Sequence, residues 1–263
     1  MSSKRLTNAA GLRRDIELLQ VLGKHEAQVG SGLGVIRIAE LAGREKTQVS
    51  RALSTLAEQG LVDRDSKTLL YRLGWRLYAL AAQTFEAHLV GIASPYLRRV
   101  AELVKETTHL CVLRNDEVLT IRTESPSHAF RAHWEGLTSP APSTSAGRVL
   151  VSEWEESAIR AKWTNAELAA AGGAKHFTST DEFLKELSKI KSRGYAIVDE
   201  EFEIGVVGCS APVRDLSGRI VAAINVGAPK ARLGTKLNQA GQITKKIAEE
   251  LSAALYSPTQ NLR

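Results

Sequence analysis

Residues 46–56 of this 263-residue chain read Lys-Thr-Gln-Val-Ser-Arg-Ala-Leu-Ser-Thr-Leu, and their spacing separates two faces of one helix. At about 100° per residue, the apolar side chains share one arc of about 100°; they are Val49, Ala52, Leu53 and Leu56. The opposite arc is polar and carries Thr47, Arg51 and Ser54, with Gln48 and Thr55 beside them. Arg and Gln form paired hydrogen bonds with guanine and adenine. The stretch therefore predicts a helix that packs on one face and reads DNA with the other, and a merely solvated polar face is the alternative.

The segments around this helix predict a winged helix-turn-helix domain. Residues 11–23 carry an apolar stripe at helical spacing, made of Leu12, Ile16, Leu19 and Leu22. Residues 35–42 repeat the helical period, and Gly60 ends the third helix. Two β-type runs, 61–64 and 69–73, then flank a turn at 65–68.

Ten polar or basic residues of this domain are candidate DNA contacts. On the helix they are Lys46, Thr47, Gln48, Ser50, Arg51, Ser54 and Thr55, and on the wing they are Arg64, Lys67 and Arg72. A helix in this position enters the major groove, and basic wing residues reach backbone phosphates. Winged helices also bind other proteins, so a protein partner is the alternative to DNA.

The distribution of charge agrees with a nucleic-acid partner for the first third of the chain. The formal net charge is +6, and residues 1–90 hold 13 Lys and Arg against 9 Asp and Glu, a net of +4. The remaining 173 residues carry only +2. A basic surplus favours association with DNA, which is itself strongly acidic.

Several other classes of protein are excluded by composition and motifs. Two cysteines, Cys111 and Cys209, provide neither a disulfide scaffold nor a structural zinc site. The first residues contain no apolar signal core, and no segment approaches the roughly 18 apolar residues of a membrane span. The glycines of 30–34 do not match the dinucleotide fingerprint. We expect a soluble cytoplasmic protein without a metal or cofactor.

The rest of the chain predicts an α+β domain of roughly 170 residues, large enough to bury its own core. A helix is expected at 75–89, a break and domain boundary at Ser94-Pro95, and a further helix at 96–107. Strands are expected at 109–114, 117–123, 195–198, 205–213 and 219–226, and a last helix at 235–255. Capping-box spacing predicts three helix starts, at Ser152 with Glu155, Thr164 with Glu167 and Ser179 with Glu182. The second of these helices is expected to end at Gly172 and the third at Gly194.

The order of several motifs resembles the IclR family of bacterial transcriptional regulators. In the first domain the similar segments are residues 38–42 (IAELA), 46–53 (KTQVSRAL), 60–62 (GLV) and 71–74 (YRLG). In the second they are 143–150 (STSAGRVL), 193–196 (RGYA), 199–213 from Asp199-Glu200-Glu201 to Ala211-Pro212-Val213, and 225–229 (NVGAP). The chain departs from the family in a longer loop at 25–34, in Arg44-Glu45 and in Asn225-Val226-Gly227.

This resemblance implies a division of the chain into three parts. They are a winged helix-turn-helix DNA-binding domain at 1–74, a linker helix at 75–92, and a GAF-like domain at 93–263 that binds a small effector and oligomerises. Members of the family act as repressors or activators on operator DNA, as homodimers or dimers of dimers.

The resemblance also implies an effector site in the second domain. It places there the backbone N–H groups of Ser145 and Ala146 together with Asp199, Cys209, Asn225 and Gly227. The residues alone leave Asn225 open between a ligand contact and an internal hydrogen bond, and Cys209 fits a small core residue as well. His128 and Arg131, near His133 and Trp134, form either an anion-binding cluster or a solvated loop. The expected effector is a small organic carboxylic acid, which an aromatic acid would also satisfy.

An enzyme remains the alternative from a different class of function. Cys209 could serve as a nucleophile with His128, His133 or His176 as its base. The chain contains no G-x-S-x-G, HExxH or P-loop pattern. We therefore expect a regulator and not an enzyme.

Overall fold

A computed structural model describes residues 3–24, 32–126, 134–171, 174 and 177–255, with the backbone alone for residues 3–9. The contacts between residues divide the chain into two compact units, Met1–Ala87 and His88–Arg263. Within the described ranges, no helix combines the length and the apolar composition that crossing a bilayer requires.

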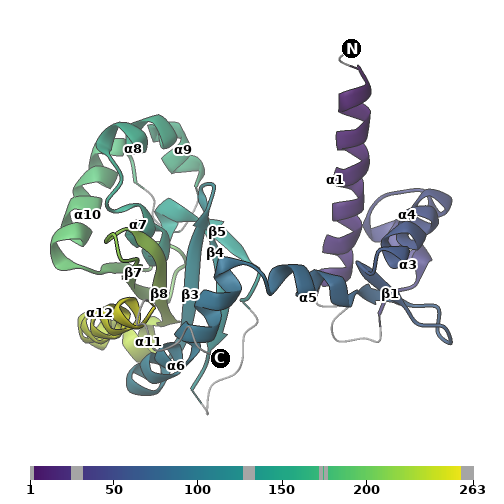
Figure 1. Cartoon of the computed structure of the whole chain (residues 1–263). Helices are drawn as coiled ribbons and strands as arrows, with labels where there is room; N and C mark the ends of the chain where they lie inside the picture. Colours follow the sequence, from purple (N-terminus) through teal and green to yellow (C-terminus); the bar gives the residue numbers. More distant parts are fainter. Residues whose placement is uncertain (1–2, 25–31, 127–133, 172–173, 175–176, 256–263) are drawn as a thin grey trace. The chain divides into compact units, whose positions relative to one another are not determined.

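The first unit is a winged helix-turn-helix, as the sequence predicted (Figure 1). Its elements are α1 (Ser3–Gly23), α3 (Val35–Leu41), α4 (Lys46–Glu58), β1 (Val62–Arg64), β2 (Tyr71–Leu73) and α5 (Trp75–Ala81). β1 and β2 pair antiparallel around the expected turn. Val49 and Leu53 of α4 are fully buried with Ile38 of α3 and with Leu18 and Leu22 of α1. Burial of this apolar face fixes which side of α4 remains in contact with solvent.

The apolar stripe expected on α1 is not buried in its first half. Leu12 and Ile16 are 65% and 45% exposed, whereas Leu18, Val21 and Leu22 pack against α3 and α4. Helical spacing allows both sets, because the last turns of α1 contain apolar residues on more than one side. Contact with α3 and α4 selects the set that is buried.

The second unit is built on one six-stranded antiparallel sheet in the order β5-β4-β3-β8-β7-β6. Its strands are β3 (Thr107–Arg114), β4 (Glu117–Glu124), β5 (Thr138–Pro140), β6 (Ala196–Asp199), β7 (Val206–Arg214) and β8 (Ile220–Pro229). Its helices are α6 (Phe85–Val104), η1 (Ala141–Ser143), α7 (Ser145–Val151), α8 (Glu156–Lys162), α9 (Asn165–Ala170), α10 (Thr180–Arg193), α11 (Lys230–Leu233), η2 (Gly234–Lys236) and α12 (Leu237–Ala254).

Helices cover both faces of this sheet, and each face has its own core. On one face, buried residues of α6 and α12, such as Leu97 and Leu251, pack with Ile224 of β8. On the other face, α7, α8, α9 and α10 pack with Ala223 of β8 and Cys111 of β3. Neighbouring residues of β8 therefore serve opposite cores, because side chains alternate along a strand.

Three expected boundaries in this unit are wrong. The helix expected at 75–89 is two helices, since α5 ends at Ala81 and α6 begins at Phe85. Pro95 breaks nothing and lies inside α6, where the surrounding apolar face is buried against the sheet. Ser152 ends α7 and does not start a helix, and α8 begins after Glu155. Burial of a whole helix face outweighs the local cost of one proline.

Two other helix signals are confirmed. Thr164 and Glu167 form the expected capping box of α9. Ser179 caps α10 through the backbone N–H of Glu182, although the Glu182 carboxylate accepts from Thr178 instead of Ser179. Gly194 ends α10 with a φ of 83°, a left-handed conformation that favours glycine. Gly172 lies outside the described residues.

Candidate functional site

The outward face of α4 is exposed over its whole length. The seven candidate contacts on α4 are all exposed, while Val49, Leu53 and Leu56 are buried. The side chains of Lys46 and Arg51 make no hydrogen bond or ion pair with any residue in the described part of the chain. Their side chains are therefore available to an external partner.

The start of α4 is held by Glu45. Its carboxylate accepts a hydrogen bond from the backbone N–H of Gln48 at 3.1 Å, which satisfies one of the unpaired groups of the first turn. Hydrogen bonds from Thr47 and Gln48 lower the pKa of Glu45. Glu45, one of the residues at which the chain departs from the family pattern, thus acts as the N-cap of α4.

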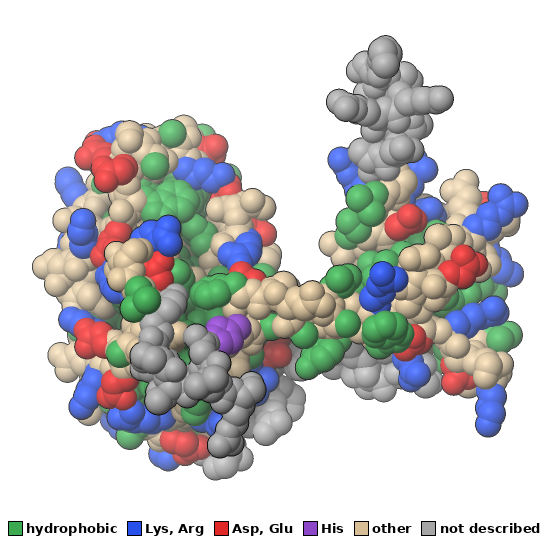
Figure 2. All heavy atoms as spheres, viewed as in Figure 1, with side chains coloured by type: hydrophobic (Ala, Val, Ile, Leu, Met, Phe, Trp, Pro, Cys, Tyr) green, Lys and Arg blue, Asp and Glu red, His purple; other side chains and the backbone are tan. Residues whose placement is uncertain are grey.

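The wing presents its basic side chains to solvent. Asp65 closes the turn by accepting from the backbone N–H groups of Lys67 and Thr68 at 2.9 and 2.7 Å, and these bonds lower its pKa. The Arg64 guanidinium lies 5.4 Å from the centre of the Tyr71 ring, and Arg72 lies 3.9 Å from the Asp63 carboxylate. Figure 2 shows Lys and Arg side chains over the region of α3, α4 and this hairpin.

A cavity of about 290 Å³ opens in the second unit between the sheet and the start of α7. Four of the expected effector residues line it: Ser145, Ala146, Asn225 and Gly227. Apolar walls come from residues on β4, β6, β7 and β8 and from Phe202 and Trp134. A mostly apolar cavity with a few converging polar groups suits a small organic ligand.

At the polar end of the cavity, Asn225 is hydrogen-bonded by Ser145, which also lines the cavity, and by the buried Ser210. The Ser145 and Ser210 hydroxyls lie 2.8 Å apart, and each lies within 3.1 Å of the Asn225 Oδ1 atom. Asn225 therefore makes an internal hydrogen bond through Oδ1 and also lines the cavity. Its Nδ2 group has no acceptor among the residues that the structure describes.

The first turn of α7 adds further donors. Thr144 Oγ1 accepts from the backbone N–H of Gly147 at 3.1 Å. The N–H groups of Ser145 and Ala146 find no acceptor within the described ranges. These two groups and Asn225 Nδ2 are hydrogen-bond donors, so this end of the cavity is chemically matched to an acceptor such as a carboxylate.

His109 is a cavity residue that the sequence analysis missed. It lies on β3 directly opposite Asn225 of β8 in the strand register, and it is 7% exposed. Its Nδ1 atom lies 3.0 Å from Thr123 Oγ1, and its ring meets Trp134 edge-on at 6.1 Å. Burial lowers the pKa of His109 to about 4. A polar residue on an apolar strand is a signal that His109 shares with Asn225.

Cys209 does not line the cavity, contrary to expectation. It is fully buried on the opposite face of the sheet, where its Sγ atom lies 3.9 Å from Thr244 Oγ1 of α12. Its neighbour Gly208 is the residue of β7 at that point of the cavity wall. Burial raises the pKa of the Cys209 thiol to about 12, which removes the thiolate that a nucleophile needs.

Asp199 is the remaining expected effector residue that the structure describes. Asp199 ends β6 and pairs with Lys230 at 2.9 Å, outside the cavity lining. His128, Arg131, His133 and His176 lie outside the described residues. Among the residues that are described, no group of three His, Cys, Asp or Glu side chains could hold a metal ion.

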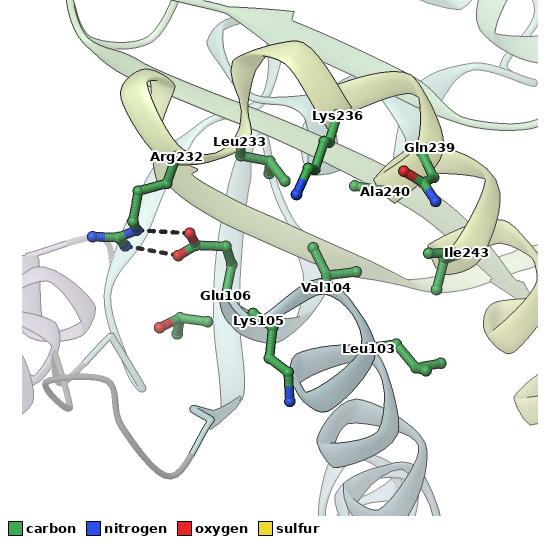
Figure 3. Close-up of a pocket in the computed structure, with 11 residues that line it drawn as sticks. Leu103, Val104, Lys105, Glu106, Arg232, Leu233, Lys236, Gln239, Ala240 and Ile243 are labelled. Atoms are coloured by element: carbon green, nitrogen blue, oxygen red, sulfur yellow. Dashed lines mark hydrogen bonds and ion pairs between the residues drawn. The ribbon is translucent and has the colours of Figure 1, made fainter.

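Arg232, which lines both the cavity and a second hollow, forms a bidentate ion pair. Arg232 Nε and Nη2 each lie 2.7 Å from the carboxylate of Glu106, which is 6% exposed. Arg232 lines the cavity and also a hollow of about 620 Å³ on its other side. Figure 3 shows residues of α11, η2 and α12 facing the end of α6 across that hollow. Within the described cavity wall, the charge of Arg232 is thus already compensated.

Comparison with protein-family models gives two matches. The model for the IclR helix-turn-helix domain matches residues 11–66. The model described as bacterial transcriptional regulator IclR C-terminal matches residues 81–253, which is most of the second unit.

Individual relatives agree with these matches. The chain is 28% identical over 246 residues to the HTH-type transcriptional regulator BhcR of Paracoccus denitrificans, covering 92% of this chain and 85% of the relative. It is 27% identical over 254 residues to the p-hydroxybenzoate hydroxylase transcriptional activator of Acinetobacter baylyi, covering 92% and 90%. A solved structure of an IclR homolog from Microbacterium hydrocarbonoxydans, complexed with 4-hydroxybenzoate, has a TM-score of 0.76 at 21% identity and covers 93% of this chain and 98% of that one.

Proposed function

This chain belongs to the IclR family of transcriptional regulators, and from that premise we propose that a small aromatic carboxylic acid in the cavity of the second unit controls how the first unit binds an operator. The relatives named above are transcriptional regulators, in agreement with the expectation that the chain is not an enzyme. The burial of Cys209 also removes the nucleophile on which the enzyme alternative depended.

In this proposal α4 reads the bases of the operator. The exposed polar face, with Gln48 and Arg51 among its residues, enters the major groove, and the wing residues Arg64, Lys67 and Arg72 contact phosphates. The support is that the opposite face of α4 is fully occupied by the core, so the polar face is the one left for a partner.

The observation that carries the effector proposal is the donor-rich end of the cavity. The free N–H groups of Ser145 and Ala146 lie beside Asn225, and the remaining walls are apolar. A carboxylate accepts from such donors, and an aromatic ring fills an apolar chamber of this size. Two relatives are consistent with this class, since one is named for p-hydroxybenzoate hydroxylase and one was solved with 4-hydroxybenzoate. His128 and Arg131 remain part of the proposal as further anion contacts.

The regulator is proposed to act as a homodimer or a dimer of dimers. Leu12 and Ile16 on α1 and Trp75 and Tyr78 on α5 are large apolar side chains that remain exposed in the single chain. Contact between copies would bury them and would place two reading helices on adjacent half-sites. Light scattering of the purified protein measures the assembly, and a monomer at micromolar concentration would exclude it.

A footprint on the DNA that flanks the chain's own gene, followed by titration with acids, tests the whole proposal. We expect a protected palindromic site and a change in operator affinity of about 5- to 150-fold at saturating 4-hydroxybenzoate. 4-Hydroxybenzamide, which lacks the negative charge, is the matched control and should have little effect. Unchanged operator affinity at saturation with every acid tested would contradict control by an acid.

A further inference from the structure

The described wall of the cavity offers an anionic ligand no uncompensated positive charge. Its described wall contains one permanently charged group, Arg232, and the carboxylate of Glu106 already neutralises it through two hydrogen bonds of 2.7 Å. Transfer of a carboxylate from water into a mostly apolar chamber is costly unless a positive charge accompanies it. Among the residues that the structure describes, the wall therefore provides no uncompensated cation for the anion.

His109 is placed to provide that cation. It lines the cavity, it stands opposite Asn225 in the register of β3 and β8, and Asn225 contacts Ser145 at the start of α7. The Nδ1 atom is occupied by Thr123 Oγ1, and Nε2 has no partner among the described residues. Nε2 is thus a free polar atom at the end of the cavity that carries the other unpaired donors.

We propose that the cavity takes up an aromatic monocarboxylate together with one proton, and that the His109 imidazole holds this proton as the cationic partner of the carboxylate. This inference rests on the proposed function and assigns the residue that selects an anionic effector. Solvent supplies the proton, Nε2–H then donates to the carboxylate, and Nδ1–H donates to Thr123 Oγ1.

The surroundings of His109 favour this exchange. The neighbouring strands contribute uncharged side chains, Thr123 on β4 and Asn225 on β8. The charged groups nearby are compensated: Arg232 by Glu106, and Arg122 by Glu124 and Glu135. Cys111, two residues along β3, stays protonated because burial raises its pKa to about 12.

The direction of the pH effect follows from these surroundings. With a pKa of about 4, His109 is neutral in the empty cavity near neutral pH. A carboxylate at hydrogen-bond distance raises the pKa of an imidazole, by about 1–3 units for a close opposite charge. Binding therefore takes up protons above pH 4, and affinity for the acid increases as the pH falls.

Calorimetric titration of the full-length protein with 4-hydroxybenzoate tests the inference. At pH 5.5, the binding enthalpy in two buffers of different ionisation enthalpy should show uptake of roughly 0.2 to 0.9 proton per ligand, the range that a pKa shift of about 1–3 units gives. The Kd should rise about tenfold in total between pH 5 and pH 8, with most of the rise at the acid end. 4-Hydroxybenzamide should bind without proton uptake, and this control needs no variant.

His109→Gln identifies the group that takes up the proton. Gln keeps an N–H donor but cannot titrate, so this variant should bind 4-hydroxybenzoate about fourfold more weakly than the original protein at pH 5.5, the effect expected for a pKa shift of about 2 units, with a Kd that no longer depends on pH. His88→Gln, at an exposed position of α6, should retain the uptake and the pH dependence. Circular dichroism confirms the fold of both variants.

Two results would overturn the inference, and they differ in their consequences. If 4-hydroxybenzoate binds and changes operator affinity without proton uptake, or if His109→Gln retains the uptake, His109 is not the cationic partner and the proposed function stands. If no aromatic acid binds at any pH while the operator is still bound, both the inference and the effector proposal are wrong.

Discussion

Arg51 and Lys67 are both exposed cations of the first unit, but they are expected to contact different parts of the DNA. Arg51 lies on the exposed polar face of α4, which is proposed to read the bases, and Lys67 lies in the turn of the wing. Arg51→Ala should weaken binding to the specific site by about 1–3 kcal/mol, and Lys67→Ala should mainly lower the salt dependence, by about one unit of slope.

Fluorescence anisotropy with operator and with scrambled DNA at several salt concentrations distinguishes the two effects. Lys185→Ala, an exposed lysine of α10 in the second unit, is the control and should change neither quantity. An Arg51→Ala protein with unchanged preference for the operator would show that Arg51 reads no base.

The ion pair between Arg148 and Glu201 is the most deeply buried one in the described part of the second unit. The two groups lie 2.8 Å apart, and the Arg148 side chain is 2% exposed against 29% for Glu201. The Arg148 guanidinium also donates to Pro142 O and lies over the Phe177 ring. Glu201→Gln keeps the shape but leaves a buried charge without its counter-ion.

We therefore expect Glu201→Gln to lower the free energy of unfolding by about 2–3 kcal/mol, less than for a fully buried pair because Glu201 is partly solvated. The acid should also bind more weakly, since the next residue, Phe202, lines the cavity. Urea unfolding measures the first effect, and Glu203→Gln at an exposed neighbouring position provides the control. Equal urea midpoints for the two variants would contradict a stabilising role for the pair.

At the scale of elements, two helical glycines of the second unit have opposite surroundings. A Cβ atom on Gly147 of α7 would lie 2.2 Å from the backbone oxygen of Ala141, whereas one on Gly91 of α6 would meet nothing within 4 Å. Gly147 therefore permits the close approach of η1 to α7 that positions the free N–H groups beside the cavity.

Gly147→Ala should lower the free energy of unfolding by about 1–3 kcal/mol through overpacking, and it should weaken acid binding as α7 shifts. Gly91→Ala should raise stability by about 0.5–1 kcal/mol, because alanine restricts the unfolded chain and favours a helix. Thermal unfolding of both variants measures the difference. A Gly147→Ala protein as stable as Gly91→Ala would show that the contact with η1 is easily relieved.

Local spacing predicted the helices and strands better than it predicted how they pack. The capping box at Thr164 and the glycine at 194 are interactions within a few residues, so the sequence is sufficient to identify them. Pro95 and the stripe of α1 were misjudged because long-range burial decided them. Local signals predict an element, and tertiary contact decides how long it is and which face it buries.

At the scale of the whole molecule, we expect the proposed regulation to pass from the second unit to the first through the connection between them. Residues 82–84 join α5 to α6. Insertion of two glycines between Gln83 and Thr84 should leave operator affinity and acid affinity within about threefold of their original values. The effect of the acid on operator affinity, expected at about 1–3 kcal/mol, should fall close to zero.

The same insertion between Leu216 and Ser217, in the exposed turn between β7 and β8, is the matched control and should preserve the coupling. Anisotropy titrations with and without 4-hydroxybenzoate measure both variants. Full coupling after insertion at residues 83–84 would show that the acid acts by another route, such as contact between copies of the chain.

The sequence by itself determined the winged helix-turn-helix, the polar face of α4 and the α+β class of the second unit, because each depends on the period of side chains along one element. Through a resemblance to a family, it also grouped Ser145, Ala146, Asn225 and Gly227 in one expected site, and all four line the cavity. Only the tertiary structure decided that Cys209 faces away from the cavity and that His109 faces into it. Strand alternation gives two faces, but which face meets α7 and which meets α12 depends on contacts between residues far apart in the chain.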